Sequence, residues 1–162
     1  MRPKTLYTIG YSRKSIEEFI PLLEKNHVTL LLDVRDSGKS LHRPEFRSSA
    51  LAASLEAYGI DYCHIPELGV LYAVRQPYIQ GKISNDEFRK WYHRNIEESH
   101  RSEFLEAVRL VAAEDACLMC LEASAVPAGD QKIYCHRYFL AEEILAFRDV
   151  NGLPVVEKVV HL

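Results

Sequence analysis

Short apolar runs alternate along the chain with segments in which apolar residues return every three or four positions. The apolar, β-prone runs predict five strands, at residues 6–10, 28–34, 60–65, 116–121 and 154–160. The segments with helical periodicity predict helices at residues 15–26, 48–58, 84–97, 102–113 and 136–147. Because strands and helices alternate, we expect an α/β protein, with a single domain over residues 1–162. Its sheet should be Rossmann-like, doubly wound and parallel, with about five strands between two layers of helices.

Two of the predicted helices carry start signals. Ser15 with Glu18, and Ser84 with Glu87, have the spacing of a capping box, in which each side chain binds a free backbone N–H of the first turn. Residues 66–82 carry no such signal and show little periodicity, so we expect a long loop or lid between the third strand and the next helix.

Composition narrows the class of protein. The chain has 162 residues and a net charge of −3, so no global basic bias supports nucleic-acid binding, although a local basic patch stays open. The N-terminus lacks the apolar core of a signal peptide, and no apolar run approaches the roughly 20 residues that cross a bilayer. We therefore expect a soluble protein of a bacterial or archaeal cytoplasm, without membrane contact and with its four cysteines reduced.

Polar residues follow the predicted strands. In a doubly wound sheet, ligands bind beyond the carboxyl ends of the strands. Four polar segments lie at such positions: residues 10–12 with Tyr11 and Ser12, residues 33–35, residues 66–69 with Glu67, and residues 120–122. We expect these segments to converge on one edge of the sheet and to form a cleft for a small anionic ligand.

Asp33 and Arg35 follow the most apolar strand and are two residues apart, so both side chains should point to the same face. Asp33 could move protons while Arg35 binds an anion, or the two could form a structural ion pair. The loop at residues 37–46 adds Arg43, whose planar guanidinium suits phosphate and similar anions. A solvated loop without a ligand is the alternative.

Cys117 and Cys120 form a C-x-x-C string within a predicted strand. Residues three apart in a strand point to opposite faces, so the string is neither a zinc nor a redox motif by itself. We expect Cys117 to be a buried core thiol and Cys120, near the end of the strand, to face the site.

The string Cys135-His136-Arg137 opens the last predicted helix. A helix N-terminus favours a thiolate over a thiol and attracts anions. Cys135 or Cys120 could therefore be a nucleophile, with Arg137 as an anion ligand. Cys120, Cys135 and His136 could instead be three metal ligands with an open fourth position, and a binding site without covalent chemistry is a further alternative. Glu122 could be a general base or a partner that orients Arg137 or His136.

Several strings in fixed order resemble the domain-of-unknown-function 488 family, over nearly the whole chain: TIGYSRKSIEEF, LLLDVRDSGKS with PEF, YCHIPELG, CLE and CHR. The resemblance implies a compact α/β domain found in prokaryotes and no established activity. Tyr11 stands where this family commonly has histidine, which weakens an acid/base role at that position. The loop at residues 123–134 is longer than usual for the family. The layout of D-V-R, H-I-P and a strand-end cysteine also resembles rhodanese domains, but the loop after Cys120 is too long for their cradle of backbone amides.

Together these patterns predict an enzyme that acts on a small anionic or nucleotide-like substrate in a cleft at the carboxyl edge of the sheet. A ligand- or nucleic-acid-binding module without catalysis is the alternative, and a rhodanese-like thiol or metal site is a further one. We assign no metal, and the cofactor and the oligomeric state stay open. The candidate catalytic residues are Asp33, Cys120, Glu122, Cys135 and His136, and the candidate substrate-binding residues are Tyr11, Ser12, Arg35, Arg43, Glu67 and Arg137.

Overall fold

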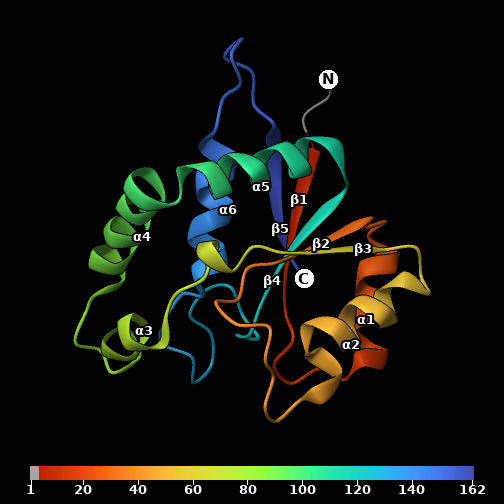
Figure 1. Cartoon of the computed structure of the whole chain (residues 1–162). Helices are drawn as coiled ribbons and strands as arrows, with labels where there is room; N and C mark the ends of the chain where they lie inside the picture. The colour runs from red at the N-terminus through yellow and green to blue at the C-terminus, as the bar shows by residue number, and fades with distance from the viewer. Residues whose placement is uncertain (1–3) are drawn as a thin grey trace.

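A five-stranded parallel sheet forms the centre of the structure, a computed structural model that describes residues 4–162. The strands are β1 (Lys4–Gly10), β2 (Leu30–Asp33), β3 (Asp61–His64), β4 (Ala116–Cys120) and β5 (Val156–His161). Their order across the sheet is β3-β2-β4-β1-β5, and every neighbouring pair is parallel (Figure 1). The predicted α/β class is thereby confirmed.

Helices cover both faces of the sheet. They are α1 (Ile16–Lys25), α2 (Ser48–Glu56), α3 (Tyr72–Ile79), α4 (Asn85–Ser99), α5 (Arg101–Ala113) and α6 (His136–Ala146), with short 3₁₀ turns η1 (Pro44–Phe46) and η2 (Pro66–Leu68). α1 and α2 lie on one side of the sheet, and α4 and α6 lie on the other (Figure 1). Within residues 4–162, none of the helices combines the length and the hydrophobicity that a bilayer crossing requires.

Each face of the sheet has its own apolar cluster, because side chains alternate along a strand. In β2, Leu31 packs against α1 and α2, whereas Leu30 and Leu32 pack on the face that α4, α5 and α6 cover. The same alternation separates the two cysteines of β4. Cys117 belongs to the cluster with α1 and α2, and Cys120 belongs to the opposite cluster, as the sequence predicts.

Both predicted capping boxes are present. Ser15 caps α1 and Ser84 caps α4, and in each case the serine side chain and the glutamate three residues later exchange hydrogen bonds with the backbone. The prediction of a long irregular loop at residues 66–82 is wrong, because this segment contains η2 and α3. α3 has no side-chain cap and contains Pro77, so the ordinary signals of a helix are missing from its sequence.

The strand order reverses beside β4. From β1 the chain moves by α1 to β2 and by α2 to β3, and it then returns on the opposite face to β4 and, by α6, to β5. The connections after β1 and β4 therefore leave on opposite faces, which opens a crevice at the carboxyl ends of these neighbouring strands. Gly10 and Cys120 are register partners at these ends, so Cys120 lies at the switch point of the sheet.

Gly10 is required by a close approach of two chain segments. A Cβ atom at this position would lie 1.6 Å from the backbone oxygen of Glu122 and 3.1 Å from Nη1 of Arg137. No side chain fits in that space. The glycine thus lets the segment after β4 cross directly over the end of β1, which fixes the position of Glu122 beside Cys120.

Candidate functional site

Two cavities lie at the carboxyl edge of the sheet and share Arg75 and Leu121 in their walls. The inner cavity has a volume of about 150 Å³ and is lined by Tyr11, Arg35, Asp36, Ser37, Lys39, Val70, Arg75, Cys120, Leu121 and His136. The outer cavity has a volume of about 490 Å³ and is lined mainly by residues 12–13, 121–124 and 128–131, with Arg75. Segments that are far apart in the sequence therefore meet at one place, with a cysteine in the inner wall.

Cys120 is the last residue of β4 and is only 4% exposed. Its Sγ atom lies 3.7 Å from Nδ1 of His136 and 3.7 Å from Oε2 of Glu122. Both neighbours can accept a proton from a thiol. The strand end thus presents a sulfur atom that touches two proton acceptors and the inner cavity at the same time.

His136 is the first residue of α6 and is 7% exposed. Its Nε2 atom lies 2.7 Å from the backbone oxygen of Val34. A carbonyl oxygen only accepts hydrogen bonds, so Nε2 carries the proton and Nδ1 of the neutral ring has a free lone pair. The contact with Val34 therefore sets the tautomer in which Nδ1 is the acceptor on the side of Cys120.

Cys135 is the N-cap residue of α6 and is 1% exposed, and its Sγ atom lies within 4.8 Å of Sγ of Cys120. A hydrogen bond from its thiol holds the pKa of the Cys120 thiol below its ordinary value and outweighs burial, which acts in the opposite direction. The positive charges of Arg137 and Arg75 lower the same pKa further. Burial, together with the hydrogen bond and charge of Cys120, raises the pKa of Cys135 to about 12. The two thiols are therefore unequal, since their surroundings lower the pKa of Cys120 and raise that of Cys135.

Asp33 and Arg35 form a buried ion pair. Nε of Arg35 donates to Oδ1 of Asp33 at 2.9 Å, and Nη2 donates to Oδ2 at 2.7 Å. Burial lowers the pKa of Arg35, but the bonds and charge of Asp33 prevail and raise it, so the guanidinium stays charged. Nη1 has no hydrogen-bond partner among the described residues. Arg35 also lines the inner cavity, and this buried nitrogen is a polar atom of the kind that needs an explanation.

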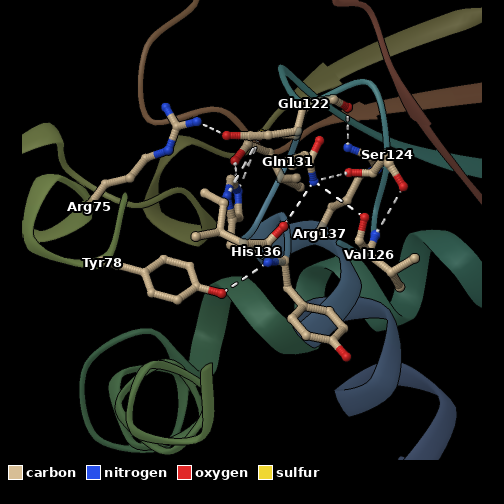
Figure 2. Close-up of polar contacts among 12 residues, drawn as sticks. Arg75, Tyr78, Glu122, Ser124, Val126, Gln131, His136 and Arg137 are labelled. Atoms are coloured by element: carbon tan, nitrogen blue, oxygen red, sulfur yellow. Dashed lines mark hydrogen bonds and ion pairs between the residues drawn. The ribbon is translucent and has the colours of Figure 1, made fainter. Parts of the chain in front are cut away.

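Arg75 adds a second guanidinium to the wall of the inner cavity. It projects from α3 and forms an ion pair with Oε1 of Glu122, as Figure 2 shows. Lys39 also lines the cavity, and within residues 4–162 no carboxylate pairs with its ammonium group. Asp36 is the only carboxylate in the wall of the inner cavity as described. The wall thus carries three cationic side chains. Arg35 and Arg75 are paired with Asp33 and Glu122, whereas Lys39 is not paired among the described residues and is the cation most available to an anionic ligand.

Arg137 lies in the core beneath the site. It is 0% exposed, its Nη1 donates to the backbone oxygen of Glu122 at 2.7 Å, and its Nε donates to Oγ1 of Thr8 at 3.3 Å. These bonds tie α6 to β1 and to the segment after β4. Arg137 does not line either cavity in the described part of the chain, so its charge acts on Cys120 from behind.

The two thiols and the imidazole could also hold a metal ion. One ligand atom from each of Cys120, Cys135 and His136 lies within 4.8 Å of the others. Two sulfurs and one nitrogen are a donor set that suits Zn²⁺, and the hydrogen bond from His136 to Val34 is of the kind that orients a metal-bound imidazole.

The structure brings most, but not all, of the predicted site residues together. Tyr11, Arg35, Cys120 and His136 line the inner cavity, and Ser12 and Glu122 line the outer one. Asp33 and Cys135 lie directly behind these walls.

Arg43 and Glu67 lie elsewhere. Arg43 donates to Glu45 and to the backbone oxygen of Lys14. Glu67 is exposed beside a separate cavity of about 180 Å³. Neither side chain is among the described residues that line the cavities near Cys120.

Three residues that support or line the site were not among the predicted site residues. Arg75 lies in the segment expected to be irregular, and its partner Glu122 is distant in the sequence. Tyr62 donates to Oδ2 of Asp33 at 2.5 Å. Gln131 donates to the backbone oxygens of Ser124 and Ile133, both at 2.9 Å, and so closes the loop that lines the outer cavity (Figure 2). No local spacing signals any of these contacts.

The fold and the site together define a class: a doubly wound α/β protein with a thiol pair and an imidazole at the switch point of its sheet. Residues 15–144 match the family described as "Domain of unknown function DUF488". The chain belongs to this family, as its motifs suggest. No curated protein and no solved structure matches the chain.

Proposed function

We propose that this protein is an enzyme that uses the thiolate of Cys120 as a nucleophile toward a small anionic substrate. One observation carries the proposal: the sulfur atom lies in the wall of a cavity whose other walls present Arg35, Lys39 and Arg75. A thiol beside cations and a proton acceptor is the environment in which cysteine becomes reactive.

The volumes of the two cavities suggest which part of a substrate each one holds. The inner cavity of about 150 Å³ has room for a compact group of a few heavy atoms, such as a carboxylate or phosphate with the atom attached to it. The unused Nη1 of Arg35 and the ammonium of Lys39 would bind its charge. The outer cavity of about 490 Å³ would accept the remainder of the molecule, which fits a substrate of nucleotide-like size.

His136 supplies the base. Its Nδ1 atom accepts the proton of the Cys120 thiol, while Nε2–H stays bonded to Val34 and holds the ring in place. The sulfur then forms a bond to the electrophilic atom of the substrate, and the leaving group departs with the electron pair of the broken bond. The proton on Nδ1 is available to the leaving group. Asp33 takes no proton in this scheme, since its role is to hold Arg35.

Alkylation of Cys120 tests the proposal without knowledge of the substrate. The protein, treated with a chelator and fully reduced, is reacted with iodoacetamide, and the modified cysteine is identified by peptide mass. We expect Cys120 to react first, and phosphate or citrate to slow that reaction. Lys39→Ala and Arg75→Ala should weaken the protection, whereas the exposed controls Lys90→Ala and Arg109→Ala should not.

Two results would contradict the proposal. Uniformly slow alkylation of Cys120 would show that the thiol is not a nucleophile, and protection by anions would then support a binding module without catalysis. Fast alkylation that no anion slows, or protection that Lys39→Ala and Arg75→Ala leave unchanged, would show that the cavity does not bind anions.

A further inference from the structure

A second thiol lies behind the first, and the function proposed above does not use it. We infer that Cys135 is a resolving thiol, and that the substrates are small disulfides that carry carboxylate groups. This inference rests on the proposed function, because it requires Cys120 to be the attacking nucleophile.

The arrangement of the two sulfurs gives them different access. Cys120 lines the inner cavity, whereas Cys135 is 1% exposed and is not among the described residues that line either cavity. An electrophile in the cavity therefore reaches Cys120 alone. Sγ of Cys135 lies within 4.8 Å of Sγ of Cys120 on the protein side, so Cys135 can react only after a group has become attached to Cys120.

The position of Cys135 indicates which kind of covalent intermediate forms on Cys120. An acyl or phosphoryl group on Cys120 is electrophilic at carbon or phosphorus, and water resolves it from the cavity. A neighbouring thiol is useful when the Cys120 sulfur itself is electrophilic, as it is in a mixed disulfide. Lys39 of the inner wall, which pairs with no carboxylate among the described residues, favours a substrate with negative charge over an uncharged peroxide.

The proposed reaction consists of two thiol–disulfide exchanges. The Cys120 thiolate attacks one sulfur of the substrate R–S–S–R, a mixed disulfide Cys120–S–S–R forms, and R–S⁻ leaves. Cys135 then loses its proton and attacks the Cys120 sulfur, which forms the Cys120–Cys135 disulfide and releases the second R–S⁻. The two thiols have supplied two electrons, and the protons of both thiols go to the departing thiolates. An external dithiol reduces the protein disulfide by the same exchange and completes the cycle.

Oxidised glutathione, an anionic disulfide, is the probe. Incubation with the reduced, chelator-treated protein should produce an internal Cys120–Cys135 disulfide, seen as the loss of two hydrogens in the intact mass and as a linked peptide. Cys135→Ser should instead accumulate a stable adduct of one glutathione on Cys120. Cystamine, a cationic disulfide, should react about tenfold more slowly than glutathione disulfide. Cys63→Ser, at the half-buried cysteine of the edge strand β3, should behave as the unaltered protein does.

Cys135→Ala provides a second test should the serine variant fold poorly, and it should also trap the adduct. A stable glutathione adduct on the unaltered protein, or oxidation by peroxide but not by disulfides, would overturn the inference. So would a stoichiometric metal ion that purifies with the protein and depends on both thiols. If anions still protect Cys120 from alkylation in those cases, the proposed function survives and only the resolving role of Cys135 falls.

Discussion

Asp33→Asn should strongly destabilise the protein, because it leaves the guanidinium of Arg35 buried without a counter-charge. The side chains of Asp33 and Arg35 are 0% and 6% exposed. The carboxylate accepts four hydrogen bonds: from the backbone N and Nε of Arg35 at 3.1 and 2.9 Å, from Nη2 at 2.7 Å and from the Tyr62 hydroxyl at 2.5 Å. An asparagine amide offers one oxygen, and its NH₂ group would face donors on the other side.

The size of the stability loss follows from the burial of the ion pair. Removal of one partner from a buried ion pair costs about 3–5 kcal/mol. In a chain of this length that loss lowers the melting temperature by roughly 6–20 °C. Urea unfolding followed by circular dichroism measures it directly. Asp86→Asn is the matched control, because Asp86 is exposed and pairs with Arg89 and Lys90 on the surface of α4, where we expect no resolvable change.

Two outcomes would refute the reasoning. Equal stabilities for Asp33→Asn and Asp86→Asn would show that the Asp33–Arg35 pair is not shielded from water. The double variant Asp33→Asn/Arg35→Met should recover part of the lost stability, since it removes the uncompensated charge. A double variant less stable than Asp33→Asn would show that the cost has another origin.

Three further predictions concern the site and its scaffold. Gly10→Ala should cost several kcal/mol in urea unfolding, because its Cβ would overlap a backbone oxygen, whereas Gly59→Ala, with open space but φ of 67°, should cost only about 1 kcal/mol. The rate of alkylation of Cys120 should rise with pH at an inflection below the ordinary thiol value of about 8.5. Cys135→Ala should move that inflection upward by removing a donor, and Cys135→Ser, which keeps a donor, should not. Ser15→Ala should lower stability by about 1 kcal/mol through loss of the α1 cap, and an unchanged urea midpoint would contradict this.

Local patterns in the sequence predicted the parts of the site that lie within one element. Side chains alternate in direction along a strand, which predicts that Cys117 and Cys120 point to opposite faces of the sheet. The structure places them on opposite faces. The two-residue spacing placed Asp33 and Arg35 on one face, and it left open whether they pair or act separately. Their short distances show that they pair.

Contacts between distant elements could not be predicted in the same way. The same motif that contains His64 and Pro66 suggested Glu67 as a site residue, but the turn at η2 carries Glu67 to a separate cavity. The string at the start of α6 suggested Arg137 as a ligand for anions, but its side chain is buried. Spacing gives the face on which a residue lies, whereas packing decides whether that face meets solvent or another element.

The sequence by itself determined the order of the five strands and of the helices other than α3, the caps of α1 and α4, and the residue types gathered at the ends of β1, β2 and β4. These features depend on interactions between residues a few positions apart. Only the tertiary structure decided that Sγ of Cys135 lies within 4.8 Å of Sγ of Cys120, that Nε2 of His136 is bonded to Val34, and that Arg75 of α3 lines the same cavity as Cys120. Each of these depends on how α3 and α6 pack against the sheet, which no local pattern encodes.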